Sequence, residues 1–403
     1  MVAVACAGRR CTASTQSRRG LSSARGKEDV HSNNSLQPCR SNDTAGEPRP
    51  ASARKSDGGA SSICGVRRGL LKAASVALVN GAGLPRLAGA VGQASTPTVV
   101  DKAFGVKGDG QSNDRTNLQR AIDQSVGKTL LLTGASRIDA SGLQLRSGSR
   151  LRFEPGASLA LLPHEQATYQ MLRIWDVQGV VVEGAVLDGK KDLNKAGNEA
   201  DRDGYGMGIS VAGSSNVTLI SPVTVGCWGD GIYIANSYQR KGQTSSHITV
   251  LDHLASDCRR QGVSIVSGSN ILIERPVWQR IGGTLPSAGL DIEPNSNLDV
   301  LDNIRVVNPV SRHCRTGILI YLQALVGPQA KLINIEISGH RDELSAVAPL
   351  NISGLKLDGN VVTGSIRVNS STWVGSRMRR LRSDDYDVIR GPKIIMEGLK
   401  IIS

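Results

Sequence analysis

Two acidic residues two positions apart are the strongest candidates for chemistry in this sequence. Asp291 and Glu293 lie in the segment Gly289-Leu-Asp-Ile-Glu-Pro, where no other residue is charged. If this segment is a β-strand, both side chains leave the same face, about 6.6 Å apart along the chain. Glycosidases pair two carboxyl groups about 5–5.5 Å apart for retention and about 6.5–9.5 Å apart for inversion. The spacing therefore allows either outcome, with an edge to inversion, and crowding raises the pKa of one acid as an acid catalyst requires.

A third acid, Asp230, completes the predicted acid/base set. It lies in the segment Trp228-Gly-Asp-Gly-Ile, and strand spacing places it roughly 10 Å from the pair. An aspartate between glycines is equally typical of a turn. The candidate catalytic residues are therefore Asp230, Asp291 and Glu293.

Cationic, aromatic and further acidic side chains near these acids are the candidate substrate-binding residues. They are Trp228, Tyr233, Arg259, Arg260, His313, Arg315 and, in the polar loop 190–206, Asp203. In a lyase or epimerase, Arg259 or Arg260 would neutralise a uronate carboxylate, and Tyr233 or His313 would relay the proton. Trp228 is suited either to stacking on a sugar ring or to covering the floor of a groove. A residue such as His313, beside a cysteine, is also explained by a structural role.

A repeat must position these residues. One series of short strands begins with a glycine, and the glycines follow each other at intervals of 23, 31, 27 and 28 residues: Gly208, Gly231, Gly262, Gly289 and Gly317. A second series of β-branched runs alternates with it, starting at Asn216, His247, Asn270, Asn303 and Asn334. Two interleaved series at one interval predict a repeat of two or three strands without a helix, whose units stack as a parallel β-helix.

The alternation within each glycine-led strand predicts which side chains face outward. The first and third residues after the glycine are aliphatic and should point inward, so the second and fourth should point outward. This places Tyr233 and Asp291 in one outward column and Glu293 in the next. Three cysteines precede the repeat glycines at similar positions, Cys227, Cys258 and Cys314, and we interpret them as inward packing rather than as metal ligands.

The body of the repeat is preceded by one helical pattern. Asp114 is a plausible N-cap, and Leu118, Ala121 and Ile122 follow at helical spacing. The sequence therefore predicts one short amphipathic helix that covers the N-terminal end of the β-helix.

The positive charge of the chain is concentrated at its N-terminal end. The chain has 48 Lys and Arg against 35 Asp and Glu, and residues 1–90 hold 14 of these bases but only 5 of the acids. The net charge of +13 is thus mostly a property of the leader and does not indicate a nucleic-acid-binding body. Only 3% of residues are aromatic, which argues against a stacking-based single-strand binder. No run of about twenty uninterrupted apolar residues predicts a membrane-spanning helix.

The leader ends in a pattern typical of an export signal. The segment 66–72 (VRRGLLK) resembles the twin-arginine motif, and a mildly apolar stretch and small residues ending at Ala90 or Ala94 follow it. This predicts a periplasmic or secreted protein. The expected organisation is a disordered leader or a segment before the true start over residues 1–66, a signal over 67–94, an N-terminal cap over 97–130, the β-helix over 131–375, and a basic C-terminal segment with the last strand over 376–403.

At this point the sequence resembles the pectate-lyase superfamily. The segment 108–122, with GDG, NDRT and QRAI, is similar to the N-terminal capping segment of that superfamily, while 153–157 (FEPGA) and 184–189 (GAVLDG) resemble the first coils of polygalacturonases. The resemblance implies a right-handed, single-stranded parallel β-helix and a carbohydrate ligand. Gln261 and Leu290 stand in the segments where polygalacturonases carry paired aspartates and a Gly-His-Gly. Their ordinary hydrolytic constellation is therefore not expected here.

These features together predict an exported enzyme that cleaves glycosidic bonds of a polysaccharide, most simply an acidic one. A uronate lyase or C5-epimerase is the first alternative, and a glycan-binding β-helix without catalysis is the second. We expect no cofactor, with Ca²⁺ as an option for a lyase although the acids of loop 190–206 show no spaced ligand motif. We also expect no nucleic-acid partner and no membrane anchor; the oligomeric state, monomer or trimer, stays open.

Overall fold

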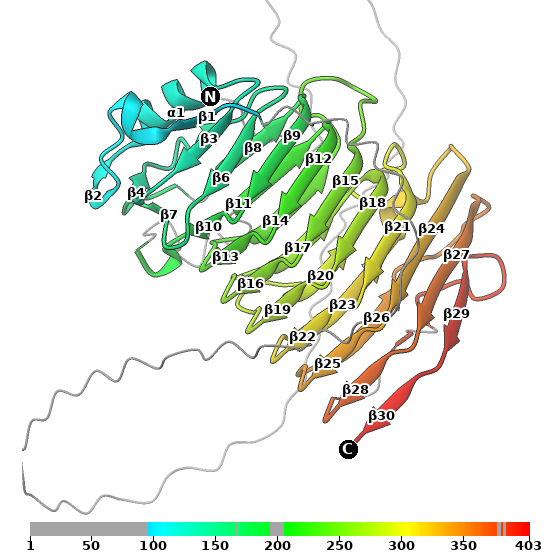
Figure 1. The fold of residues 1–403 in the computed structure, drawn as a ribbon. Helices are drawn as coiled ribbons and strands as arrows, with labels where there is room; N and C mark the ends of the chain where they lie inside the picture. Colours follow the sequence, from blue (N-terminus) through cyan, green and yellow to red (C-terminus); the bar gives the residue numbers. More distant parts are fainter. Residues whose placement is uncertain (1–95, 167, 194–204, 377–379, 382–383) are drawn as a thin grey trace, which may run out of the picture. The chain divides into compact units, whose positions relative to one another are not determined.

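Three stacks of parallel strands form the part of the chain that the structure describes. The computed structural model describes residues 96–166, 168–193, 205–376, 380–381 and 384–403. Figure 1 shows the chain winding from the first coils (cyan) to the last (red), each coil stacked on the one before it. The predicted leader and export signal, residues 1–94, lie outside the described residues.

Each coil contributes one strand to each stack along most of the length. The first sheet contains β1 (Thr98–Val100), β3 (Thr129–Leu132), β6 (Arg150–Phe153), β9 (Gln178–Glu183), β12 (Ser215–Ile220), β15 (Ser246–Leu251), β18 (Gly268–Glu274), β21 (Leu301–Val307), β24 (Lys331–Ser338), β27 (Val362–Asn369) and β29 (Lys393–Glu397). The second sheet contains β2 (Asp109–Asn113), β4 (Ala135–Ile138), β7 (Ser158–Leu161), β10 (Val186–Asp188), β13 (Val223–Val225), β16 (Leu254–Ser256), β19 (Val277–Gln279), β22 (Val310–Arg312), β25 (Arg341–Glu343), β28 (Thr372–Val374) and β30 (Lys400–Ile402).

The third sheet is the one that carries the glycine-led repeat. It contains β5 (Leu143–Gln144), β8 (Tyr169–Trp175), β11 (Gly206–Ala212), β14 (Asp230–Ala235), β17 (Gln261–Ile265), β20 (Ala288–Ile292), β23 (Thr316–Tyr321) and β26 (Ala348–Ser353). Neighbouring strands pair in parallel, for example β14 with β17 and β17 with β20. The predicted fold, an all-β, right-handed parallel β-helix, is confirmed.

The N-terminal cap holds the predicted helix but not the predicted capping contact. Helix α1 (Arg115–Gln124) buries Leu118, Ala121 and Ile122, as its spacing predicts, and follows the 3₁₀ turn η1 (Asp101–Phe104). Asp114 precedes α1 without capping it through its side chain. Its carboxylate instead accepts the backbone N–H groups of Lys107 and Gly108, at 2.7 and 2.8 Å. The Asp114 carboxylate therefore holds the preceding loop in place, because it accepts two backbone N–H groups of that loop.

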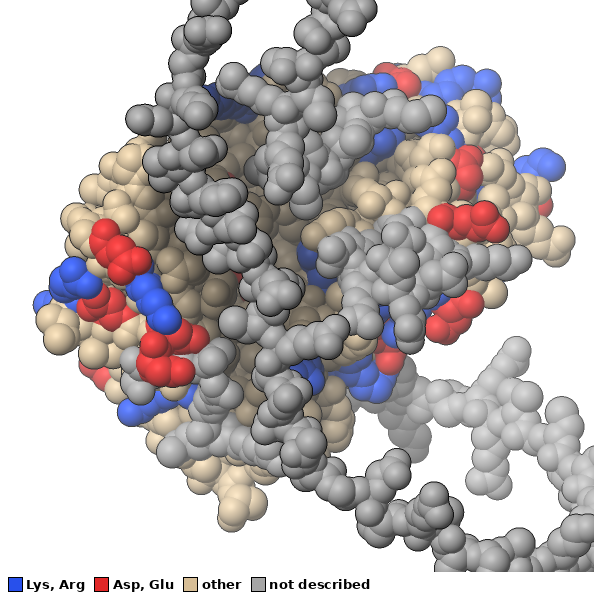
Figure 2. Space-filling model, turned by 180° about the vertical axis from the view of Figure 1, so that it is seen from behind, with Lys and Arg blue, Asp and Glu red and all other residues tan. Residues whose placement is uncertain are grey.

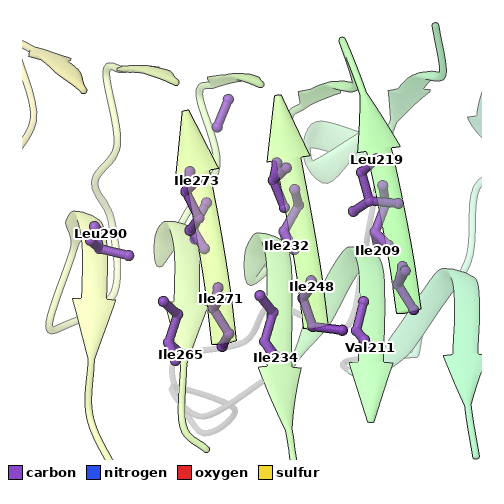
Figure 3. Packing of buried hydrophobic residues seen from close by; sticks show 14 of the residues in the cluster. Ile209, Val211, Leu219, Ile232, Ile234, Ile248, Ile265, Ile271, Ile273 and Leu290 are labelled. Atoms are coloured by element: carbon purple, nitrogen blue, oxygen red, sulfur yellow. The ribbon is translucent and has the colours of Figure 1, made fainter. Parts of the chain in front are cut away.

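The interior of the β-helix explains why a glycine recurs in the third sheet. Aliphatic side chains such as Ile209, Ile232 and Ile234 stack coil upon coil inside it (Figure 3). A Cβ at Gly231 would lie 2.4 Å from Oγ1 of the buried Thr224, and one at Gly262 would lie 2.5 Å from Cδ1 of Trp278. Side chains of the second sheet thus fill the space in front of these glycines. Cys227, Cys258 and Cys314 are buried free thiols, in keeping with inward packing.

The remaining elements are short. The 3₁₀ turns η2 (Lys191–Leu193) and η4 (Gln323–Leu325) lie in loops, and the segment predicted to carry the last strand, 376–403, contains two strands, β29 and β30. None of the helices in the described part is long and apolar enough to cross a membrane.

Candidate active site on the outer face of the third sheet

The outward column predicted from the repeat exists, and it crosses neighbouring strands of the third sheet. The pairing register aligns Ser210 with Tyr233, Tyr233 with Ser264, and Ser264 with Asp291. Contrary to the usual state of outward carboxylates on a β-helix, however, Asp291 is only 4% exposed and Ser264 only 3%. The outer face of the third sheet is therefore a partly desolvated surface.

Two loops help to enclose this column. The segments that follow β14 and β20 meet where Asn236 Nδ2 donates to Asp299 Oδ1 at 2.6 Å. The side chain of Asn295, in the second of these segments, lies near the Tyr233 hydroxyl. Burial raises the pKa of Tyr233 well above its usual range, so the phenol stays neutral and is a donor rather than a base.

Asp291 and Glu293 form a directly interacting carboxyl pair at the end of β20. Gln261 Nε2 donates to Asp291 Oδ2 at 3.0 Å, Asp291 Oδ1 is buried without a hydrogen-bond partner among the described residues, and the Asp291 and Glu293 side chains interact with each other. Burial, and then the charge of Glu293, raise the pKa of Asp291 well above its ordinary value. Burial also raises the pKa of Glu293, against smaller opposing effects of Asp291 and Arg260. Two adjacent carboxyl groups with raised pKa values favour a state in which one of them keeps its proton.

Asp230 is engaged in a buried ion pair. Its side chain is fully buried and accepts from Arg260 Nε at 2.9 Å and from Arg260 Nη2 at 2.6 Å. Ser264 Oγ donates to the same carboxylate at 3.1 Å. Burial lowers the pKa of Arg260, but the charge and hydrogen bonds of Asp230 outweigh it, and the net pKa is raised. Arg260 also lies over the ring of Tyr205, 4.5 Å from its centroid, so the guanidinium is held on two sides.

Three of the predicted binding residues share one column at the corner before the third sheet. Backbone hydrogen bonds from Arg259 to Cys227 and from Arg315 to Ile281 place Arg259 beside Trp228, with Arg315 two coils further along. The Arg259 guanidinium stacks on the Trp228 ring, 3.8 Å from the centroid, and its Nε donates to the Trp228 carbonyl at 2.6 Å. Arg315 is exposed. This column borders the outer face on which the acids lie.

His313 and Asp203 are not part of this cluster as described. His313 is exposed and occupies a corner turn with φ 49°, equivalent to Asp257 and Arg280 with φ 58° and 52°. Its backbone N–H bonds the Glu343 carbonyl of the next coil, as that of Arg280 bonds Arg312. Its position matches the repeating turn, which supports the structural interpretation. Asp203 lies outside the described residues.

Several residues of the candidate site were not predicted from the sequence. Gln261, which binds Asp291, occupies the strand position that is in register with Asp230, so the repeat register was a usable signal. Asn295, Tyr205 and Tyr238 come from segments without a period, and no pattern in the sequence pointed to them.

The face of the described part that is seen from behind carries charges of both signs. Figure 2, a view from behind, shows Lys and Arg interspersed with Asp and Glu on the described residues rather than a uniformly basic surface. Within the described ranges, no group of three or more His, Cys, Asp or Glu side chains is arranged to hold a metal ion. The option of Ca²⁺ stays a prediction.

Comparison with solved structures identifies the fold. No protein-family model matches the sequence, and no curated protein gives a significant match. The chain resembles a protein described as 1,3-α-1,4-β-D-galactose-4-sulfate-3,6-anhydro-D-galactose-2-sulfate 4 galactohydrolase, with a TM-score of 0.58, 12% identity and coverage of 77% of this chain and 89% of that one. The likeness shows the fold, a right-handed parallel β-helix.

Two further structures have the same fold with different names. An endo-xylogalacturonan hydrolase from Aspergillus tubingensis gives a TM-score of 0.50 at 14% identity, covering 75% of this chain and 92% of that one. An N-terminal fragment of bacteriophage Phi29 gene product 12 gives 0.51 at 15% identity, covering 75% and 57%. A β-helix of this type thus occurs in hydrolases and in a phage gene product, and the reaction must be argued from the site itself.

Proposed function

We propose that this protein is a polysaccharide hydrolase in which Asp291 and Glu293 act as the acid/base pair. The observation that carries the proposal is their interaction on a partly desolvated outer face, where burial raises both pKa values and the charge of Glu293 raises that of Asp291 further. General acid catalysis near neutral pH needs a carboxyl group that keeps its proton. The hydrolases that share the fold support a glycan as substrate.

The roles within the pair follow from the burial of the two side chains. Asp291, which is buried whereas Glu293 is half-buried, donates its proton to the glycosidic oxygen as the bond to the anomeric carbon breaks. A water molecule attacks that carbon, and Glu293 takes the proton that the water releases. The pair thus begins and ends with one proton. Substrate entry has to part the two carboxyl groups, because inversion needs about 6.5–9.5 Å between them.

Asp230 and Arg260 support this chemistry from the neighbouring strands. Both oxygens of Asp230 bind Arg260, so in this proposal Asp230 is a positioning residue rather than a proton carrier. The cation it holds limits the rise of both pKa values in the pair. A bidentate contact also fixes the guanidinium plane beside the substrate path.

An acidic glycan and export complete the proposal. Arg259 and Arg315, in the corner column beside the site, suit the carboxylate or sulfate groups of such a chain. The twin-arginine motif in residues 66–72 supports export to the periplasm or beyond. A lyase or epimerase is less well supported, because Tyr233 has a strongly raised pKa and His313 lies at a corner turn.

Product analysis tests the reaction type. The full chain is incubated with polygalacturonate, alginate, sulfated galactans and neutral polysaccharides, and the products are examined for new reducing ends, ultraviolet-absorbing unsaturated ends and epimerised uronates. We expect reducing ends without unsaturation, and their loss in Asp291→Asn. Unsaturated ends or epimerised sugars would replace the hydrolase by a lyase or an epimerase, and binding without any product would favour the non-catalytic alternative.

A further inference from the structure

The outer face of the third sheet carries a second group of side chains near its N-terminal end. Arg173 and Trp175 lie on β8, and the register runs from Arg173 through Ser210, Tyr233 and Ser264 to Asp291. Four strand steps of about 4.8 Å separate Arg173 from Asp291 along the axis, roughly 19 Å in all. The two groups therefore share one continuous column, and several consecutive sugar rings would span it.

An aromatic pair forms the base of this second group. The ring of Tyr238, from the loop after β14, packs edge-on against Trp175, with centroids 4.9 Å apart and the planes at 68°. Trp175 Nε1 donates to Ser210 Oγ at 2.9 Å. The Tyr238 hydroxyl also bonds Ser210, and burial raises its pKa to about 12. Two strands and one loop thus hold both rings in a fixed orientation.

The charge beside these rings is not balanced. Arg173 lies 5.5 Å from the Trp175 ring centroid, and among the described residues it forms no salt bridge and its buried Nε has no hydrogen-bond partner. Burial and the like charge of Arg115 lower its pKa. Arg115 Nε donates to the Gly142 carbonyl at 3.2 Å. The nearby acid, Asp139, interacts electrostatically with Arg115, and its carboxylate accepts a hydrogen bond from Asn113 Nδ2.

We propose that Arg173, Trp175 and Tyr238 form a distal binding subsite for an anionic sugar of the substrate chain. The apolar face of a pyranose ring packs against the exposed part of the aromatic pair, and the carboxylate or sulfate of the ring binds the Arg173 guanidinium, whose charge no described carboxylate neutralises. A half-buried cation and two aromatic rings lie together at this position, and stability alone does not require that arrangement. The subsite rests on the proposed function in one respect: the glycan that it binds is the one that also reaches the acid/base pair.

Retardation by an immobilised glycan tests the subsite. Affinity electrophoresis in gels containing polygalacturonate, iota-carrageenan or dextran compares the wild type with Arg173→Ala, Trp175→Ala and Arg173→Lys. We expect retardation by at least one of the two acidic glycans, a five- to fifty-fold weaker Kd in Arg173→Ala and Trp175→Ala, partial retention in Arg173→Lys, and no retardation by dextran. The two acidic probes separate carboxylate from sulfate recognition.

A matched control separates a local from a general charge effect. Arg305 is an exposed arginine on β21 of the first sheet, and Arg305→Ala should bind as the wild type does, while thermal melts check that each variant is folded. Wild-type binding in an Arg173→Ala/Trp175→Ala double variant, or no binding of either acidic glycan by the wild type, overturns the subsite. Binding that depends on Arg173 without any hydrolysis would retain the subsite and refute the hydrolase. Hydrolysis with a KM that is unchanged in Arg173→Ala would retain the hydrolase and refute the subsite.

Discussion

Charged residues are treated in opposite ways at the corner between the second and third sheets and on the outer face of the third sheet. At the corner, Arg280 pairs with Asp257 at 2.7 Å with side chains 53% and 37% exposed. On the outer face, Arg260 pairs with Asp230 at 14% and 0% exposure. Hydrogen bonds from Arg280 lower the pKa of Asp257, whereas burial raises that of Asp291. Exposed pairs contribute little, but buried charges carry a desolvation cost that marks a candidate functional surface.

The largest expected difference between the two regions is in activity. Asp291→Asn or Glu293→Gln removes one proton-transfer group, and such groups contribute about 10²–10⁴-fold to a rate. We expect kcat for release of reducing ends to fall by that factor, with the fold intact by circular dichroism. The two changes should not multiply, because the carboxyl groups act as a unit.

The corner supplies the control for the activity measurement. Asp257→Asn changes an acid in an exposed ion pair and should leave kcat within about two-fold of the wild type, given the small energy of such pairs. Equal rates in Asp291→Asn and in the wild type would refute the assigned pair. A matching loss in Asp257→Asn would refute the contrast between the two regions.

Stability should also separate the two ion pairs. Arg260→Met leaves the Asp230 carboxylate buried without its cation, which costs about 3–5 kcal/mol. Arg280→Met breaks the exposed pair and should cost less than about 1 kcal/mol. Urea unfolding curves measure both differences. An Arg260→Met protein as stable as Arg280→Met would mean that Asp230 reaches water or a proton when its partner is removed, contrary to its complete burial.

The two regions also differ in the space available to an added side-chain atom at a glycine. A Cβ at Gly262, in β17, would lie 2.5 Å from Trp278 Cδ1 and 2.6 Å from the Gly289 carbonyl oxygen, whereas one at Gly282, at the corner, meets no heavy atom within 4 Å. Overpacking of a core costs about 1–3 kcal/mol. We expect Gly262→Ala to lower the midpoint of thermal unfolding and Gly282→Ala to leave it nearly unchanged. Equal midpoints would show that Trp278 can move aside.

The sequence predicted the fold far better than the contacts of the site. The interleaved glycine and asparagine series specified stacked parallel coils, and strand alternation placed Tyr233 and Asp291 on the outer face, because both depend on simple periods. The Asp230–Arg260 pair was not predicted, since the two residues lie 30 positions apart on successive coils. Repeat intervals that vary from 23 to 31 residues leave the turn lengths, and hence the side-chain positions before each strand, undetermined.

The degree of burial was the other quantity that periodicity could not provide. Outward residues of a β-helix are usually solvated, but Asp291 is buried, and loops of irregular sequence border its column. Asn236 and Asp299 join two of these loops, and nothing in their spacing predicts that they meet. For the same reason, the sequence did not predict that Tyr238 packs against Trp175.

The two regions should also differ in the sign of the pH dependence of stability. Between the ordinary pKa of an aspartate and the raised pKa of Asp291, the folded protein holds a proton that the unfolded chain has released, so the contribution of this residue to the free energy of unfolding falls as the pH rises. Each unit of raised pKa corresponds to about 1.4 kcal/mol. Asp291→Asn should remove this fall, leaving the variant more stable than the wild type at neutral pH and equal to it below the ordinary pKa. Asp257, whose pKa is lowered, contributes with the opposite sign, so Asp257→Asn should lose a little stability at neutral pH, and none once the pH is below the lowered pKa. Urea unfolding at a series of pH values measures both, and parallel pH profiles for the two variants would show that the outer face is as well hydrated as the corner.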